Sequence, residues 1–251
     1  MASAPFSLFN WNVRGLNAPG RREEVLKMLQ AARPTLVCLQ ETKLQDIPDR
    51  LAAEFLGGRL SSFFFLPALG VRGGIVLAWD VDHVIAEHLS LREFSLIAYI
   101  TIRLVNFSFT ITVVYGPTED INKQRFLAEL QQSKPPDGQP WLCLGDFNLI
   151  YQAQDKINLN LNRRYMGLFR RTLDLCELLE IALQNRKYTR SNERDNPTLE
   201  RLDRVFCNKE WDLAFPSTCL QALSSSASDH CPLFLSQFPN TAAAALYPFQ
   251  I

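Results

Sequence analysis

Trp141-Leu142-Cys143-Leu144-Gly145-Asp146-Phe147-Asn148 passes from a run of apolar residues to an acid and an amide. The apolar first half predicts a buried β-strand. Side chains alternate along an extended backbone, so Asp146 and Asn148 face one way while Phe147 faces the other. The end of this strand is therefore expected to deliver a carboxylate and a carboxamide to one surface.

Ser228-Asp229-His230 places an acid beside one of only three histidines in the chain. Neighbouring side chains point apart in an extended backbone, so Asp229 is poorly placed to orient the ring of His230. A carboxylate from elsewhere, such as Asp203, is the better candidate. An acid, an amide and an imidazole together are the groups that metal-assisted hydrolysis of a phosphate ester needs.

Composition bounds the class of protein. The chain has 251 residues, and its hydrophobic content of 47% can fill a sizeable core. We expect one domain over residues 1–236, followed by a C-terminal tail over 237–251. The 26 basic and 26 acidic residues give a formal net charge of zero. Any contact with a polyanion must therefore come from a local basic patch.

The cysteines form no C-x-x-C pair, and most lie within apolar runs, which predicts buried free thiols in a reducing compartment. They are Cys38, Cys143, Cys176, Cys207, Cys219 and Cys231. The first residues lack the basic start and long apolar stretch of a signal peptide. Prolines interrupt the uncharged tract after His230, which argues against a membrane span. We expect a soluble intracellular protein.

Short apolar runs bounded by turn residues predict many strands. They lie at 6–11, 36–40, 61–66, 74–79, 96–104, 107–115, 141–145, 202–207 and 231–235. Apolar residues at helical spacing predict helices over 22–32, from a cap at Asn122 through Leu130, and over about 163–179. This arrangement is typical of two packed sheets covered by helices.

Polar residues mark the ends of several predicted strands. Asn12 ends the first, Glu41 ends the second, Tyr115 ends another, and Asp203 begins a later one. Each residue alone is more often a turn or rim residue than a functional one. Together with Asp146, however, they favour a site assembled at one rim of the sheets.

These segments resemble a known family. The motifs WNVRGLN at 11–17, LQET at 39–42, VYGP at 114–117, GDFN at 145–148, RLDR at 201–204 and SDH at 228–230 occur in the order of the endonuclease/exonuclease/phosphatase superfamily. NPTLERLDR at 196–204 and NRRYMGLFRR at 162–171 resemble the endonuclease domain of plant LINE-type (non-LTR) retrotransposons. The resemblance spans about residues 6–235.

The resemblance implies an α/β, DNase I-like fold. This is a four-layer sandwich of two mainly antiparallel sheets flanked by helices, with the site at one rim. It also implies a divalent-metal phosphodiesterase that nicks DNA and leaves a 3′-hydroxyl from which reverse transcription can be primed. The expected partner is DNA, with no membrane and no obligate protein partner, and the expected compartment is the nucleus if chromosomal DNA is the substrate.

By the resemblance, Glu41 is the principal metal carboxylate, Asn12 lies beside it, and Asp229 is an outer or second metal ligand. Mg²⁺ prefers oxygen ligands and typically uses one or two carboxylates, so a sparse site of this kind suits it. Mn²⁺ is the alternative ion. Zinc would call for more histidine and cysteine at short spacing.

The resemblance also assigns the catalytic groups. Asp146 orients or deprotonates the attacking water and is held by Asn148. His230 contacts the scissile phosphate and stabilises its growing charge, with Asp203 orienting the ring. Tyr115 bonds a phosphate oxygen. Attack on a phosphodiester needs positive charge at the non-bridging oxygens, which a metal and an imidazolium supply.

The expected DNA contacts are Arg14, Thr189, Arg190, Arg186 and Lys187. Relatives usually carry an aromatic residue where this chain has Arg190, so a ring has become a charge. A solvated mixed-charge loop over residues 186–204 is the alternative interpretation. Four further arginines, at 163, 164, 170 and 171, are expected to cover the solvent face of their helix.

Two other functions remain open at this point. One is a phosphomonoesterase of the same superfamily, and the other is an inactive or host-retained remnant that binds nucleic acid. The chain could be an excised domain, a truncated element or a host gene.

Overall fold

The computed structural model describes residues 6–69, 73–158, 160–192 and 197–236. The described strands are β1 (Ser7–Asn12), β2 (Leu36–Gln40), β3 (Ser62–Leu66), β4 (Ile75–Trp79), β5 (Val84–Leu91), β6 (Ser95–Ile102), β7 (Phe107–Tyr115), β8 (Trp141–Asp146), β9 (Leu179–Glu180), β10 (Arg190–Ser191), β11 (Leu199–Glu200), β12 (Asp203–Cys207), β13 (Cys219–Ala222) and β14 (Leu233–Ser236). The described α-helices are α1 (Pro19–Ala32), α2 (Asp49–Leu56), α3 (Asp120–Gln132), α4 (Arg163–Leu175) and α5 (Lys209–Ala214). The predicted tail over 237–251 lies outside the described residues.

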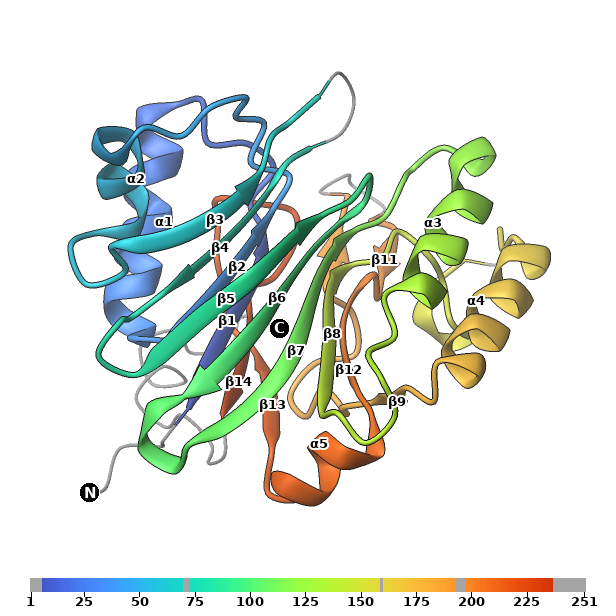
Figure 1. The fold of residues 1–251 in the computed structure, drawn as a ribbon. Coiled ribbons are helices and arrows are strands. Elements are labelled where there is room, and N and C mark those ends of the chain that lie inside the picture. Colours follow the sequence, from blue (N-terminus) through green and yellow to red (C-terminus); the bar gives the residue numbers. More distant parts are fainter. Residues whose placement is uncertain (1–5, 70–72, 159, 193–196, 237–251) are drawn as a thin grey trace.

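The strands form two large sheets and one small hairpin. Among the described residues, the first sheet has the order β13-β14-β1-β2-β4-β3, the second has the order β5-β6-β7-β8-β12-β9, and β10 pairs with β11. Most pairs are antiparallel, and the exceptions are β1 with β2 and β7 with β8. The predicted sandwich of two mainly antiparallel sheets flanked by helices is confirmed (Figure 1).

Hydrophobic packing explains the four layers. One cluster lies between the sheets and includes Leu77, Ile111 and Leu144. A second joins the outer face of the first sheet to α1 and α2, and a third joins the outer face of the second sheet to α3 and α4. Figure 1 shows these helix pairs on opposite sides of the sandwich. Each sheet therefore buries both faces, so that even polar residues of its central strands, such as Asn10 and Thr112, are fully buried.

Helix α4 is shorter than predicted. Its buried residues Met166, Phe169 and Leu173 repeat at helical spacing, as expected of an amphipathic helix. The helix nevertheless ends at Leu175, because Glu177 adopts a left-handed backbone with φ of 56°. The leucines that follow therefore lie outside the helix, and the predicted extension to residue 179 is wrong.

The cap predicted for α3 is also wrong. The helix begins at Asp120, two positions before Asn122, with Glu119 as its N-cap residue. Strands β5, β9, β10, β11 and β13 and helices α2 and α5 were not predicted. Within the described residues, no helix is long and apolar enough to cross a membrane.

The parallel pairs bring distant chain segments to one rim. Strands β1 and β2 end together, as do β7 and β8. Gly145 makes the second pairing possible, since a Cβ there would lie 2.0 Å from the carbonyl oxygen of Val114. The residues that end these strands are therefore forced into a shared neighbourhood.

Candidate active site

The strand register places the acidic residues at one end of the sandwich. Tyr115 lies opposite Asp146 at the end of the β7–β8 pair, and Asp203 pairs with Asp146 on the other side. Asn12 ends β1 in the first sheet, and Glu41 follows the end of β2. The two sheets are joined at this rim by the Asn12 side-chain amide, whose Nδ2 donates to Asp146 Oδ2 at 2.8 Å.

Asp146 is held from three directions. Besides Asn12, the backbone N–H of Asn148 donates to Asp146 Oδ1 at 2.9 Å, and the Asn148 side chain donates to Oδ2 at 3.3 Å. The same side chain donates to the carbonyl of Gly116 at 2.9 Å, which fixes its orientation. Only 1% of Asp146 is exposed. The carboxylate is therefore immobile and largely withdrawn from water.

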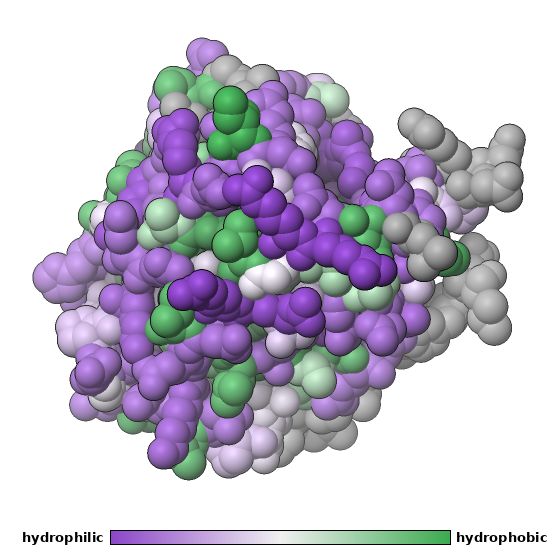
Figure 2. Space-filling model, turned by 90° about the vertical axis from the view of Figure 1, so that its right-hand side faces the viewer, coloured by the Kyte–Doolittle hydropathy of each residue, from purple (hydrophilic) through white to green (hydrophobic). Residues whose placement is uncertain are grey.

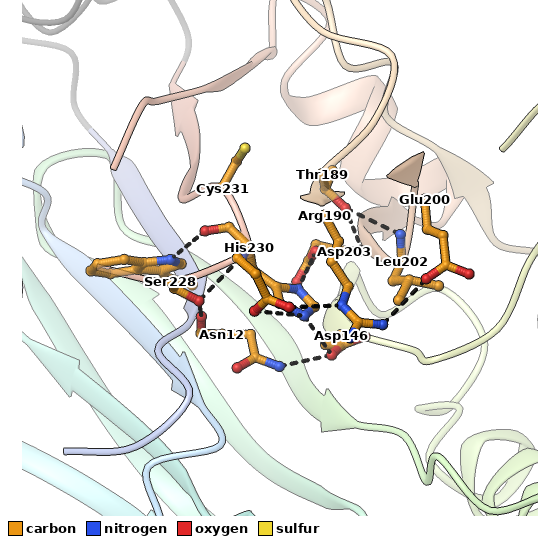
Figure 3. Close-up of polar contacts among 12 residues, drawn as sticks. Asn12, Asp146, Thr189, Arg190, Glu200, Leu202, Asp203, Ser228, His230 and Cys231 are labelled. Atoms are coloured by element: carbon orange, nitrogen blue, oxygen red, sulfur yellow. Dashed lines mark hydrogen bonds and ion pairs between the residues drawn. The ribbon is translucent and has the colours of Figure 1, made fainter. Parts of the chain in front are cut away.

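The imidazole of His230 lies among three carboxylates. Its Nδ1 contacts Asp203 Oδ2 at 2.8 Å, and its Nε2 lies 3.9 Å from both Asp146 Oδ2 and Asp229 Oδ1. Figure 3 shows the Asp203, His230, Asp146 and Asn12 side chains converging from separate strands and loops. The sequence argument that Asp203 orients this ring is consistent with the Nδ1 contact, whereas Asp229 approaches the opposite nitrogen.

The backbone around His230 is fixed as firmly as its ring. Trp11 Nε1 donates to the His230 carbonyl at 2.9 Å. Ser228 Oγ donates to the Asn12 carbonyl at 2.8 Å and accepts from the His230 N–H at 3.1 Å. The serine therefore ties the His230 loop to the end of β1. Sequence reasoning missed this role, although Ser228 stands inside the motif that it had singled out.

The charges of this cluster shift its pKa values. Burial alone would lower the pKa of His230, but Asp203 and Asp146, with Asp229, outweigh it and raise the pKa to about 9. Burial, followed by repulsion from Asp203, raises the pKa of Asp146 above its ordinary range. At neutral pH the site therefore holds an imidazolium next to a carboxylate with enhanced basicity.

Glu41 and Tyr115 form a second part of the site. Glu41 has a left-handed backbone with φ of 55°, its side chain is 13% exposed, and Lys43 Nζ lies 3.1 Å from its Oε1. Burial, then the charges of Glu41 and Asp146, raises the pKa of Tyr115, so the phenol stays protonated. The two carboxylates therefore lie near one phenol.

Gly73 packs directly over this pair. A Cβ at position 73 would lie 2.7 Å from the Glu41 Cα and 2.7 Å from a ring carbon of Tyr115. Only glycine fits between them without displacing one. Sequence reasoning did not single out this residue, and the Gly73-Gly74 dipeptide was the available signal.

Asp229 is paired with arginines. Its Oδ2 accepts from Arg14 Nη1 at 2.6 Å and from Arg190 Nε at 3.1 Å, and Arg190 also pairs with Glu200 at 3.2 Å. Although burial raises the pKa of Asp229, His230 and the guanidiniums outweigh it and hold the pKa below its usual value. Asp229 therefore carries a charge and links the imidazole to both arginines.

Thr189 was predicted to contact DNA, but its side chain is fully buried and is not placed at the surface for such a contact. Its hydroxyl accepts from the backbone N–H groups of Leu202 and Asp203, both at 3.1 Å, so it positions the start of β12. Arg186 is half-buried and donates to Cys231 Sγ and Ser224 Oγ. Lys187 is exposed and lies 5.1 Å from the centre of the Tyr188 ring.

The donor atoms of this rim suit a hard cation. Asp203 Oδ1 and Asp229 Oδ1 are buried and accept no hydrogen bond from any described residue. Ligand atoms of Asp146, Asp203 and His230 lie within 4.8 Å of one another, close enough to hold a metal ion. This trio differs from the predicted ligands Glu41, Asn12 and Asp229. Oxygen dominates both sets, which favours Mg²⁺ or Mn²⁺ over zinc.

The fold is a two-sheet sandwich flanked by helices, and its rim gathers carboxylate, amide and imidazole side chains. The chain belongs to the Endonuclease/Exonuclease/phosphatase family, whose sequence profile matches residues 9–230. Members of this family hydrolyse phosphodiester bonds and generally use a divalent metal. No curated protein sequence matches the chain.

Solved structures share the fold at low sequence identity. The AP endonuclease LMAP from Leishmania major has a TM-score of 0.71 and 15% identity, over 93% of this chain and 88% of that one. D. rerio TDP2 complexed with a single-strand DNA product has a TM-score of 0.66 and 17% identity, over 92% and 98%. The endonuclease domain of TRAS1, a telomere-specific non-LTR retrotransposon, has a TM-score of 0.64 and 13% identity, over 94% and 100%.

Proposed function

We propose that this chain is a Mg²⁺-dependent DNA endonuclease that nicks one strand and leaves a 3′-hydroxyl, as in LINE-type retrotransposition. Its place of action would then be the nucleus, where chromosomal DNA lies. The observation that carries the proposal is the convergence of His230 Nε2 and the Asp146 and Asp229 carboxylates within 3.9 Å at the rim where Glu41 and Tyr115 also lie.

Glu41 and Asn12 are the residues that we assign to the metal. The alternative trio requires Asp203 and His230 as ligands, yet these two already bond to each other at 2.8 Å. Glu41 has only a half-exposed lysine, Lys43, as its ion-pair partner among the described residues, so its carboxylate can bind a metal at little cost. A bound Mg²⁺ would polarise the phosphoryl oxygens and stabilise the charge of the leaving oxygen.

The protein groups have complementary roles in the attack. Asp146 accepts a proton from the incoming water, for which its raised pKa and its fixed carboxylate suit it. The His230 imidazolium stabilises the growing charge on a non-bridging oxygen, and Asp203 keeps the ring oriented and charged. The protonated phenol of Tyr115 donates to another phosphate oxygen. Asn148 holds Asp146 in place.

Two further points support DNA as the substrate. The TDP2 structure contains a single-strand DNA product, and the TRAS1 domain comes from a non-LTR retrotransposon. Arg14 and Arg190 place guanidiniums beside the catalytic cluster, where a phosphate backbone would lie. We found no observation that favours a phosphomonoesterase.

The test is a Mg²⁺ titration of supercoiled plasmid nicking. The parent protein should nick plasmid with Mg²⁺ and should lose this activity when EDTA removes the ion. Glu41→Gln keeps the size of the side chain but removes its charge, so half-maximal activity should require about 10–100 times more Mg²⁺. Gln45→Glu, on the nearby surface, is a matched control and should leave the titration unchanged.

The titration also separates the alternatives. Phosphate release from a monoester without plasmid nicking would favour the phosphomonoesterase. A folded parent protein that binds DNA but shows no metal-dependent turnover would favour the remnant. An unchanged Mg²⁺ requirement in Glu41→Gln would show that Glu41 is not a metal ligand, but it would not contradict the endonuclease function.

Gly73→Ala should inactivate the enzyme without unfolding it. The added methyl meets the Glu41 backbone and the Tyr115 ring at 2.7 Å, so one of them must move. A misplacement of about 1 Å at a catalytic group can reduce the rate about a hundredfold. Plasmid nicking and a thermal melt measure the two effects. Gly58→Ala has open space at its Cβ and is the control. Full activity of Gly73→Ala would show that this contact does not position the site.

A further inference from the structure

Helix α4 carries an array of arginines that form no ion pair with any carboxylate in the part of the chain that the structure describes. Arg163 and Arg170 are seven residues apart, as are Arg164 and Arg171, so two pairs align along one side of the helix. All four side chains are exposed, and none forms an ion pair with a described residue. Arg164 only approaches the ring of Tyr165, at 5.9 Å. We refer to these four residues as the α4 arginine array.

The array is unfavourable for the isolated helix. Arg163 and Arg164 occupy the first turn, where the helix dipole favours acidic groups, and that turn contains no acid. Asp174 is the sole carboxylate in the helix. The charges therefore repel one another and the dipole, which points to an anionic ligand as their compensation.

Gly167 stands at the centre of the array. It lies three or four residues from each arginine, which places it on the same side of the helix. Glycine is a poor helix former, and a Cβ at this position would meet nothing within 4 Å. Internal packing therefore does not require glycine. A bare backbone here lets a bulky ligand approach the helix surface between the arginines.

A cavity lies between the catalytic rim and the start of α4, where its lining residues Asn162 and Tyr165 flank Arg163 and Arg164 in the sequence. This cavity of about 380 Å³ is lined by Asn148 and Arg190 from the site and by Asn162, Tyr165 and Met166 from the start of α4. Lys123 and Lys156 also line it. Figure 2 views the molecule from the side on which α4 lies, and long, strongly hydrophilic side chains spread across this face.

We propose that the α4 arginine array binds the phosphate backbone of duplex DNA that flanks the scissile bond. This inference rests on the proposed endonuclease function. A chain with zero net charge needs a local basic patch to hold a polyanion, and this array forms no ion pair with a described residue and begins beside the catalytic cavity. Such contacts would position the duplex without reading its sequence.

The salt dependence of binding tests the inference. Binding of a fluorescent duplex is measured by anisotropy in EDTA, so that no cleavage occurs. A variant with all four arginines replaced by glutamine should reduce the magnitude of the slope of log K against log salt by about 3–4. Between 50 and 200 mM salt, the parent should therefore lose about a hundredfold more affinity than this variant.

A second set of substitutions controls for net charge. Four basic residues on the α1–α2 side are replaced by glutamine, which removes the same total charge from the opposite face. They are Arg21, Lys27, Arg33 and Arg50. This variant should keep the parental salt slope. An equal reduction of the salt slope in both variants would show that only net charge matters and would overturn the proposal. A parent protein that does not bind the duplex would also overturn it.

Gly167→Glu gives an independent test in which stability and binding move in opposite directions. Glutamate is a better helix former than glycine and would pair with the flanking arginines, so Tm should rise. Its charge should weaken duplex binding about tenfold. Unchanged binding of duplex DNA by Gly167→Glu would overturn the proposal. So would a parent protein that binds duplex RNA through the array more tightly than duplex DNA.

The failure of this inference can be distinguished from failure of the proposed function. A parent protein that binds the duplex through the array but never nicks it would refute the proposed endonuclease function. The proposed role of the array in DNA binding would stand. A parent protein that nicks plasmid, while the array variant binds and nicks as well at every salt concentration, would refute the inference alone. Hydrolysis of a small phosphodiester, bis(p-nitrophenyl) phosphate, should be equal in the parent and the array variant.

Discussion

Replacing His230 by glutamine should slow plasmid nicking about a thousandfold, at saturating Mg²⁺ and DNA. The ring faces Asp146 and Asp229 through Nε2, and the surrounding carboxylates raise its pKa to about 9. The group that we propose to meet the phosphate is therefore a fixed imidazolium at neutral pH. Glutamine retains a hydrogen-bond donor but no charge. The loss should appear in kcat, because the charge matters most when the phosphoryl oxygens become more negative.

A matched histidine substitution separates catalysis from folding. His83 is half-exposed and lies 3.3 Å from Asp80, far in sequence from the site motifs. His83→Gln should nick at the parental rate. Thermal melts of both variants would detect any loss of structure at the buried position 230. If His230→Gln is folded and its kcat lies within tenfold of the parental value, the imidazolium is not required for the reaction.

The sequence predicted the elements that lead into the site better than those at the edges. The ranges 36–40 and 107–115 were predicted as strands and are strands in the structure, because both lie inside their sheets and are rich in β-branched, aromatic and other apolar residues. Strand β5 was missed. It is an edge strand with a register shift between Glu87 and Ser90, so most of its residues face solvent and no regular alternation shows.

Site residues could be found where short motifs border buried strands, as at Asp146, which ends β8, and at His230, which precedes β14. What one sequence does not reveal is how distant motifs meet. Arg190 was predicted to face DNA, but its contacts with Asp229 and Glu200 could not be predicted from the sequence. The role of Gly73 depends on its close approach to Glu41 and Tyr115, which the Gly73-Gly74 dipeptide alone does not specify. These contacts arise from tertiary structure alone.

Beneath the catalytic rim, Arg204 forms a buried charge network that should dominate stability. Its side chain is fully buried, donates to Glu180 Oε1 at 2.6 Å and to the Arg201 carbonyl at 3.1 Å, and pairs with Asp155. The guanidinium also lies over the ring of Tyr151. Asp155→Ala would leave a buried guanidinium short of one carboxylate, so the free energy of unfolding should fall by about 3–5 kcal/mol.

A drop in Tm of about 10 °C is expected from that loss in a chain of this size. Asp137→Ala is the matched control, because Asp137 is 97% exposed and lies 3.9 Å from Lys134. It should leave Tm nearly unchanged. A parental Tm in Asp155→Ala would show that water or another acceptor replaces the carboxylate.

The same network allows a rescue, because its cost comes from the unpaired charge rather than from lost volume. Adding Arg204→Met to Asp155→Ala removes the stranded guanidinium and leaves Glu180 its pair with Arg201, at 2.8 Å. The double variant should therefore be more stable than Asp155→Ala alone, and urea denaturation of the single and double variants measures the coupling. Additive losses of stability in the two substitutions would contradict the network.

Asp155 also ties the connection between β8 and α4 to β12, since its carbonyl accepts from the Arg201 N–H at 2.8 Å. Loosening this connection should weaken DNA binding at the α4 arginine array before it slows the chemistry at Asp146.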